Sequence, residues 1–152
     1  DRHFPIVSAS NLWYIYGFID EQESYARRSY LDVPEQIVII PGFGAVNRKG
    51  EKILLGRNGS DLVAAMIALL TNADKLIYLK DVNGVYRNFG QDSQQLIPEL
   101  RYQEAKNIEL GKVLDKRALD LLYGSNLEVI IGHYENLIEL IKPNSRYGTR
   151  II

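Results

Sequence analysis

The chain has 152 residues, with 18 Lys or Arg against 19 Asp or Glu, so its formal net charge is −1. This length allows one domain with a substantial core, and the near-neutral charge gives no electrostatic case for nucleic acid or a membrane surface as a partner. No apolar run approaches the roughly 20 residues that span a bilayer. The chain has no cysteine, which excludes disulfides and thiolate metal sites, and we expect a cytoplasmic protein with no metal site of its own.

The first 45 residues predict four elements and a small-residue turn. Residues 4–8 indicate an edge strand and residues 20–31 a solvated helix with its acids first. The aromatic segment 10–19 could stack on a base, but it lacks interleaved basic residues, so we interpret it as filling between layers. The β-branched run 36–40 is typical of a strand in the middle of a sheet covered on both sides. Residues 42–45 leave little side-chain bulk beyond its end, where ligands bind in open α/β sheets.

The stretch 56–61, Gly-Arg-Asn-Gly-Ser-Asp, precedes a predicted helix at 62–70. Ser60 and Asp61 are both good N-cap residues. Arg57 adds a full positive charge to the partial charge of the first helical turn, so the stretch predicts a site for a phosphate or a substrate carboxylate. An ordinary glycine-rich, capped turn remains the alternative on these residues alone.

The remaining predicted elements alternate along the chain. Strands are predicted at 52–55, after a polar hairpin turn at 46–52, and then at 75–79, 127–131 and 148–152. Helices are predicted at 102–109, 112–123 and 136–141. A polar loop with the turn signal Asn83-Gly84 follows the strand at 75–79. This alternation favours an α/β fold with a mainly parallel sheet and helices on both faces.

Three groups of residues, in this order, resemble the amino-acid kinase superfamily and most of all aspartate kinases. Residues 40–43 followed by 56–61 resemble the GF turn and the GRGGSD motif. Ala73-Asp74 followed by residues 81–86 resembles AD…TDVDGVY. Residues 102–105, 111–114 and 148–149 resemble SYxEA, GAKVLHP and the terminal GT. The resemblance covers residues 36–152 and implies a partial three-layer amino-acid kinase sandwich.

The sequence also departs from the aspartate kinase pattern. Asn58 replaces the second glycine of GRGG, Lys80 replaces the threonine of TD, and residues 88–91 have lost the DPR that follows the tyrosine. Residues 113–116, Val-Leu-Asp-Lys, are closer to the KVMD of uridylate kinases. The KFGG strand-turn is missing. We therefore expect residues 1–152 to be the C-terminal part of an amino-acid kinase domain, without its N-terminal part or the ACT regulatory domains.

The resemblance implies a set of site residues. Arg57 would hold the aspartate carboxylate as a bidentate fork, with Ser60 and the helix N-terminus beside it. Asp61 would accept from the substrate amine or orient a catalytic lysine, and Lys112 would act on the phosphates. Nucleotide binding is expected of these residues: Gly42, Phe43, Gly44, Lys80, Asp81, Tyr86 and Lys112. Each has a plain structural alternative: a capping role for Asp61, a solvated helix-start lysine for Lys112, and turn formation for Asp81 and Asn83.

Three functions remain open at this point. The first is ATP-dependent phosphorylation of the side-chain carboxylate of L-aspartate, with Mg²⁺ carried by the nucleotide, in a longer and homo-oligomeric protein. The second is another kinase of the superfamily, similar to uridylate kinase. The third is a non-catalytic relative that binds a nucleotide. We expect these 152 residues alone to show no phosphoryl transfer.

Overall fold

The computed structural model describes residues 42, 44–46, 52–107, 113–143 and 145–152. The chain divides into two compact units, residues 1–72 and 73–152. The predictions made for residues 1–41 lie outside the described residues. In the described part, no helix is both long enough and apolar enough to cross a bilayer.

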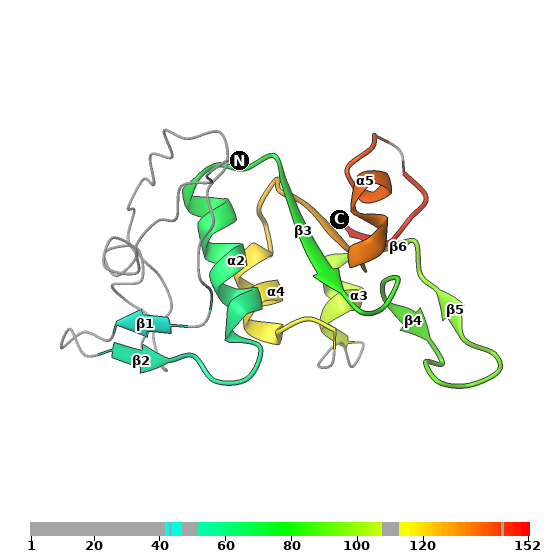
Figure 1. The fold of residues 1–152 in the computed structure, drawn as a ribbon, viewed down its shortest axis with the longest axis horizontal. Helices are drawn as coiled ribbons and strands as arrows, with labels where there is room; N and C mark the ends of the chain where they lie inside the picture. The colour runs from blue at the N-terminus through cyan, green and yellow to red at the C-terminus, as the bar shows by residue number, and fades with distance from the viewer. Residues whose placement is uncertain (1–41, 43, 47–51, 108–112, 144) are drawn as a thin grey trace, which may run out of the picture. The chain divides into compact units, whose positions relative to one another are not determined.

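The first unit contains a hairpin and a helix (Figure 1). Strand β1 (Gly44–Val46) pairs antiparallel with β2 (Lys52–Leu54), which confirms the predicted hairpin. Helix α2 (Gly59–Leu70) follows, and after its first three residues it is a continuous run of apolar residues with good helix propensity. The helix ends at Thr71, whose backbone N–H and hydroxyl both donate to the carbonyl of Ile67, at 2.9 and 2.8 Å.

The second unit is built on a four-stranded sheet with the order β3-β7-β8-β6. These strands are β3 (Lys75–Lys80), β6 (Glu99–Leu100), β7 (Glu128–His133) and β8 (Thr149–Ile151). The pairs β3–β7 and β6–β8 are parallel, whereas β8 runs antiparallel to β7. Two of the three pairings in this described sheet are parallel, which confirms a mainly parallel sheet.

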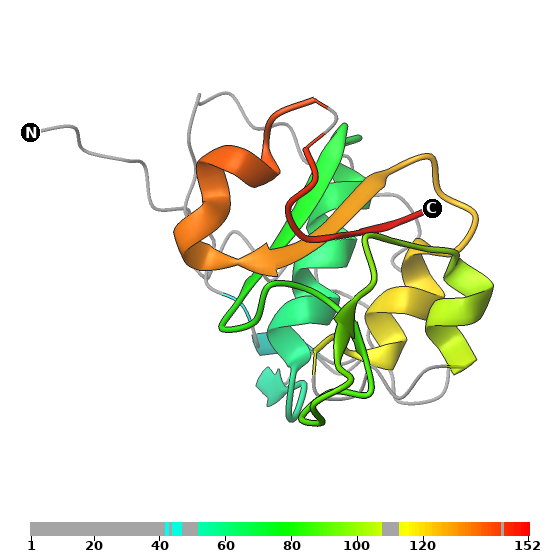
Figure 2. The ribbon, with the colours of Figure 1, turned by 90° about the vertical axis from the view of Figure 1, so that its right-hand side faces the viewer.

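Helices lie on both sides of this sheet, as expected. Helices α3 (Tyr102–Asn107) and α4 (Lys116–Leu122) pack together on one side. The short segment η1 (Tyr134–Asn136) and helix α5 (Leu137–Leu140) lie on the other side, next to β7 (Figure 2). Between α3 and α4, Lys106 forms an ion pair of 2.8 Å with Asp120.

Strand β7 is the centre of the core because both of its faces are covered. Its four middle residues are buried, and Val129, Ile130 and Ile131 have no exposed surface. Gly132 completes the run where α5 approaches the strand. A Cβ at Gly132 would lie 2.5 Å from Leu140, so only glycine leaves room for this leucine. An apolar strand buried on both faces is what the hydrophobic run at 127–131 predicted.

Three short strands escaped prediction. Strands β4 (Tyr86–Arg87) and β5 (Gln95–Leu96) form an antiparallel hairpin, and β6 precedes α3 directly. Each has only two residues, too few to show the alternation of apolar and polar side chains that marks a strand. Pairing holds them in place rather than local preference: β4 pairs with β5, and β6 pairs with the distant β8.

The predicted helix at 112–123 is wrong at its beginning, because α4 begins at Lys116. Asp115 is its N-cap, with an extended backbone (φ −64°, ψ 128°) and a side chain that accepts a 2.8 Å hydrogen bond from the backbone N–H of Arg117. The same carboxylate accepts from the Arg117 guanidinium at 2.7 Å. This capping geometry excludes Asp115 from the helix and leaves Val113 and Leu114 ahead of it. Lys112 lies outside the described residues.

We expect Asp115→Ala to lower the free energy of unfolding by about 1–2 kcal/mol, because the first turn of α4 loses its side-chain cap. Asp120→Ala, on the same helix, is the matched control. It removes only a surface ion pair and should cost less than about 1 kcal/mol. Urea denaturation of both variants measures the difference. Equal losses would contradict a capping role for Asp115.

Burial raises the pKa of the Tyr102 phenol above its usual value. A raised pKa means that the folded state holds the phenolic proton more tightly than the unfolded state. The resulting stability is complete below about pH 10 and is lost as pH rises through the folded-state pKa. Tyr102→Phe should therefore lose less stability than the wild type between pH 9 and pH 11, measured by urea midpoints. Identical slopes for both proteins would contradict this.

Candidate functional site

A cavity of about 400 Å³ opens at the carboxyl ends of β3 and β7. The two strands run parallel with Lys80 opposite His133, so the loops that follow them lie side by side. Ligand sites in proteins commonly have volumes of this order, and in open α/β sheets they lie at this end of the strands. The lining residues come from the loop that follows β3 (residues 81–85, the β3 loop), the β4–β5 hairpin and the segment at the end of β7. They are Asp81, Val82, Asn83, Tyr86, Phe89, Gln94, His133, Glu135 and Asn136.

A single buried hydroxyl holds the β3 loop in place. Thr149, on β8, has no exposed surface. Its Oγ1 accepts a 2.8 Å hydrogen bond from the backbone N–H of Val85 and donates a 2.6 Å bond to the carbonyl of Ile97. Gly84 allows this approach, because a Cβ there would lie 2.5 Å from the Thr149 hydroxyl and its φ of 146° suits glycine. Two sequence motifs far apart in the chain, residues 81–86 and Gly148-Thr149, thus form one structural unit.

The opposite wall is ordered by short-range contacts. The backbone N–H of Glu135 donates to Nδ1 of His133 at 3.3 Å, and the Glu135 carboxylate lies 3.7 Å from the same nitrogen. The Tyr134 ring stacks on the same imidazole, with 4.4 Å between ring centroids and 28° between planes. Across the cavity mouth, the Asn136 amide donates to the side-chain oxygen of Asn83 at 3.4 Å. The two strand ends are therefore linked by side chains as well as by the sheet.

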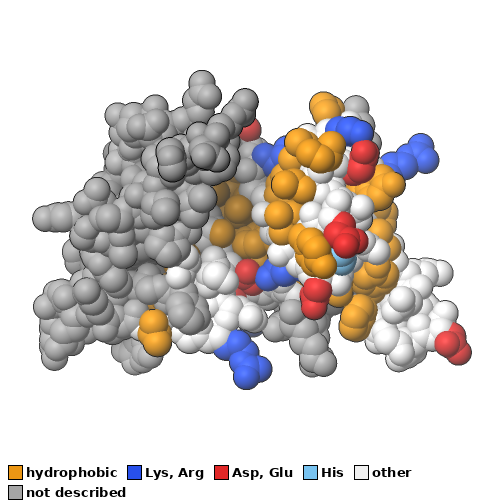
Figure 3. Space-filling view, in the orientation of Figure 1, with side chains coloured by type: hydrophobic (Ala, Val, Ile, Leu, Met, Phe, Trp, Pro, Cys, Tyr) orange, Lys and Arg blue, Asp and Glu red, His pale blue; other side chains and the backbone are white. Residues whose placement is uncertain are grey.

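The cavity lining is acidic rather than basic. Asp81 and Glu135 contribute carboxylates, and none of the lining residues is Lys or Arg. On the face shown in Figure 3, acidic side chains gather around the carboxyl end of β3 and the η1–α5 segment, among apolar side chains. Because like charges repel, this lining suits the uncharged or cationic part of a ligand better than a polyphosphate.

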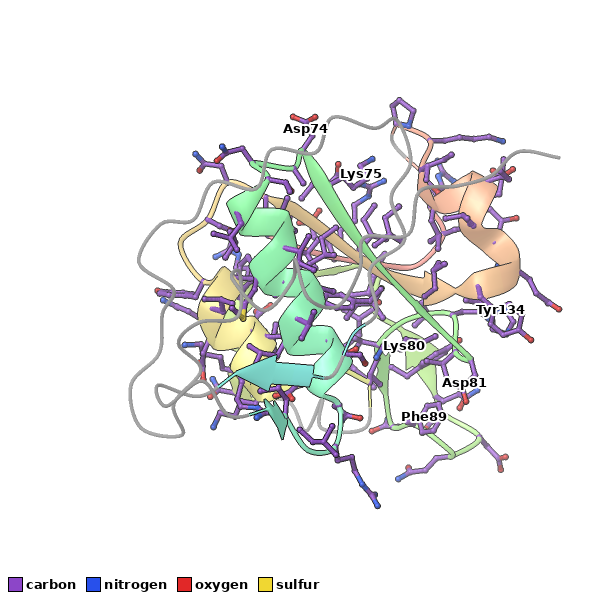
Figure 4. The ribbon with its side chains drawn as sticks, turned by 60° about the vertical axis from the view of Figure 1, so that its left-hand side comes forward. Asp74, Lys75, Lys80, Asp81, Phe89 and Tyr134 are labelled. Atoms are coloured by element: carbon purple, nitrogen blue, oxygen red, sulfur yellow. The ribbon has the colours of Figure 1, made fainter. Side chains whose placement is uncertain are left out.

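The other end of β3 is closed by ion pairs. Lys75 lies 3.1 Å from Glu128, its partner in the parallel register, and Glu128 also pairs with Arg150 of β8. Figure 4 shows Lys75 at one end of the strand, with Asp81, Phe89 and Tyr134 at the other. The two ends of β3 thus differ: ion pairs cover the end at Lys75, whereas the cavity opens at the carboxyl end.

The glycine-rich stretch of the first unit forms a tight turn. The Gly59 N–H donates to the Gly56 carbonyl at 3.2 Å, and Asn58 takes the left-handed conformation (φ 60°, ψ 15°). Glycine and asparagine are the residues that adopt this conformation most easily. Asparagine therefore satisfies the backbone where the GRGG motif has its second glycine.

The prediction that Ser60 or Asp61 caps α2 is wrong. The helix begins at Gly59 with Asn58 as its N-cap, which makes no side-chain capping hydrogen bond. Ser60 and Asp61 lie within the first turn, Ser60 exposed and Asp61 only 6% exposed. With the left-handed turn at Asn58, the helix starts two or three residues earlier in the chain than these caps would place it.

Of the residues predicted for the acceptor site, Arg57 is exposed on the turn, next to the first turn of α2. Gly42 lies against this turn, since a Cβ there would be 3.1 Å from that of Ser60. Gly44 is in β1, paired with Leu54. Phe43 and Lys112 lie outside the described residues. Gly42, Phe43, Gly44 and Lys112 are predicted for nucleotide binding rather than for the acceptor site. The structure thus brings Gly42 together with Ser60 of the predicted acceptor site, within the first unit.

Of the residues predicted for nucleotide binding in the second unit, Asp81 and Tyr86 line the cavity, whereas Lys80 does not. The Lys80 ammonium lies 5.8 Å from the centroid of the Tyr78 ring. Asn83, which the sequence indicated only as a turn residue, also lines the cavity, and six further lining residues carried no prediction: Val82, Phe89, Gln94, His133, Glu135 and Asn136. Among the described residues, no group of three or more His, Cys, Asp or Glu could hold a metal ion.

Comparison with known proteins identifies relatives of this arrangement. Residues 14–133 match the sequence model of the amino acid kinase family. The bifunctional aspartokinase/homoserine dehydrogenase of Haemophilus influenzae is 33% identical over 128 residues, which are 81% of this chain and 16% of that protein. The aspartokinase of Chlamydia pneumoniae is 40% identical over 80 residues, 51% of this chain and 18% of that protein. The chain thus spans less than a fifth of the length of both relatives.

Solved structures agree with this assignment. Escherichia coli aspartokinase III in complex with aspartate and ADP is 28% identical, with a TM-score of 0.63 over 76% of this chain and 25% of that one. The uridylate kinase of Archaeoglobus fulgidus shares the fold, with a TM-score of 0.58 and 23% identity over 76% of this chain and 51% of that one. The α/β architecture predicted from the sequence, and its likeness to aspartate kinases, are confirmed.

We expect Thr149→Val to lower the free energy of unfolding by about 2–4 kcal/mol, because it leaves the Val85 N–H and the Ile97 carbonyl buried without partners. Thr149→Ser keeps both hydrogen bonds and loses one methyl group, so it should cost only about 1 kcal/mol. Urea denaturation gives the difference, and amide hydrogen exchange at Val85 shows whether the loop has loosened. Unchanged exchange at Val85 in the valine variant would contradict the role of the hydroxyl.

Proposed function

The chain belongs to the amino acid kinase family, and from this premise we propose that it supplies the nucleotide-binding part of an ATP-dependent aspartate kinase. The reaction would transfer the γ-phosphoryl group of ATP to the side-chain carboxylate of L-aspartate. One observation carries the proposal: the cavity at the carboxyl ends of β3 and β7, in a chain whose relatives are aspartokinases. A cytoplasmic and homo-oligomeric protein remains part of the proposal.

On the nucleotide side, the role of the described residues is to bind the nucleotide and to hold it in position. Phosphoryl transfer depends mainly on alignment and on neutralising charge, rather than on covalent chemistry by the protein. The Thr149 hydroxyl fixes the loop that carries Asp81 and Tyr86, so both side chains meet a ligand at a set position. The acidic lining favours the base and sugar at the cavity. Mg²⁺ would travel with the phosphates and supply charge neutralisation there, and Lys112 would contact the phosphates.

On the acceptor side, the turn before α2 offers suitable chemistry for a carboxylate. Arg57 is exposed, and a guanidinium can bind a carboxylate through two parallel hydrogen bonds. Ser60 is exposed in the first helical turn, where the helix dipole also favours an anion. Asp61 is buried in the same turn. We propose that Asp61 accepts a hydrogen bond from the substrate amine or orients a catalytic lysine.

The runner-up functions differ in their acceptor. The uridylate kinase neighbour shares the fold, so a nucleoside monophosphate is the alternative acceptor. A chain that binds ATP and UMP but not L-aspartate would be a uridylate kinase-like enzyme. A chain that binds neither acceptor, with or without ATP, would be a non-catalytic relative. Calorimetric titration of the longest natural form of this chain with MgATP, L-aspartate and UMP separates the three.

We expect Arg57→Ala to weaken L-aspartate binding by about 10- to 100-fold, the cost of losing hydrogen bonds to a charged group. MgATP affinity should stay unchanged. Arg57→Lys should recover only part of the loss, because an ammonium cannot form the bidentate pair. Arg146→Ala, another exposed arginine, is the control and should change neither affinity. Wild-type aspartate affinity in Arg57→Ala would remove Arg57 from the acceptor site.

A further inference from the structure

Phe89 is an exposed aromatic side chain on the wall of a polar cavity. Phe89 is 63% exposed, and it lines the cavity together with Asp81 and Asn83. Single exposed apolar residues are ordinary on protein surfaces. This one differs because it lines a cavity, and Figure 4 shows it near Asp81, beyond the carboxyl end of β3.

The connection that carries Phe89 is tied together by its own hydrogen bonds. Asn88 takes a left-handed φ of 51°, and its carbonyl accepts from the Gln91 N–H at 3.1 Å. The Gly90 N–H donates to the side chain of Gln94 at 3.1 Å, and the Asn88 amide donates to the Ser93 hydroxyl at 3.3 Å. A connection with this many internal bonds presents its side chains in a defined direction. The backbone from which the Phe89 ring projects is therefore held in place.

Aromatic rings meet the cavity from both walls. On the hairpin side, the Phe89 and Tyr86 rings are 5.7 Å apart at an angle of 54°. On the β7 side, the imidazole of His133 lines the cavity and is backed by the stacked ring of Tyr134. The cavity lining contains two carboxylates, those of Asp81 and Glu135, and no Lys or Arg. These features suit a flat, uncharged aromatic group whose polar edges meet amides and carboxylates.

We propose that Phe89 stacks on the base of the bound nucleotide and is a specificity-determining residue for nucleosides over bare phosphates. This inference rests on the proposed nucleotide site and adds a contact to it. Residues 88–91 of this chain, Asn-Phe-Gly-Gln, stand where the resemblance to aspartate kinases places Asp-Pro-Arg. The chain thus has an aromatic ring, and no charged side chain, in that stretch. Stacking tolerates different bases, because every base has a π-face.

The test compares variants of the ring in the longest natural form of the chain, titrated calorimetrically with MgATP, adenosine and magnesium triphosphate. We expect Phe89→Ala and Phe89→Leu to weaken MgATP and adenosine by similar factors, about 5- to 100-fold, the range that stacking on one base provides. Phe89→Trp should bind at least as tightly as the wild type. Triphosphate affinity should be the same in all variants, and the loss should not depend on salt, because no charge is removed.

Tyr147→Ala is the matched control, since this tyrosine is 49% exposed and does not line the cavity. It should leave all three affinities unchanged, and thermal melting should show that every variant folds. If Phe89→Ala binds MgATP as the wild type does, the stacking role is overturned while the nucleotide site stands. If Phe89→Leu binds as well as the wild type, bulk rather than the aromatic face matters, and the proposal also fails. If the wild type binds no nucleotide, both this inference and the proposed function fall.

Discussion

The Thr149 hydroxyl is the contact on which the rest of the second unit depends. It is fully buried and uses both its donor and its acceptor capacity, on Ile97 and Val85. A buried hydroxyl is costly unless it is hydrogen-bonded. Strand β8, the β3 loop and the β5–β6 segment therefore depend on one another for their positions. The geometry of the cavity is therefore a property of the sheet as much as of the loops that line it.

The longer elements of the fold could be predicted from the sequence, and the short ones could not. Strands β3 and β7 and helix α2 are apolar runs whose length and composition decide their structure locally. The two-residue strands β4 and β5 exist only through pairing with each other, and β6 only through pairing with the distant β8. The amphipathic pattern predicts too early a start for α4, because the pattern includes Asp115, whose side chain instead caps the helix.

The sequence predicts only part of the candidate site, because only some of its residues lie in stretches with a local signal. Asp81 and Tyr86 lie in a stretch where a strand end, a turn signal and a motif resemblance coincide, and both line the cavity. His133 and Glu135 reach it only because β7 aligns with β3 in parallel register, which no local pattern specifies. Phe89 looked like a residue of an ordinary polar loop. Its role depends on a hairpin too short to predict.

The insertion of β8 between β7 and β6 has a consequence for folding. Strand β6 has no other strand partner among the described residues, and the Thr149 bonds join residues 52 and 64 positions apart in the chain. The parallel pairing of β3 with β7 spans a comparable separation along the chain. Contacts of such long sequence separation require large loops to close before any energy is returned, so they slow folding. The β3 loop and the cavity therefore acquire their final conformation together with the sheet, and no local segment can form them in advance.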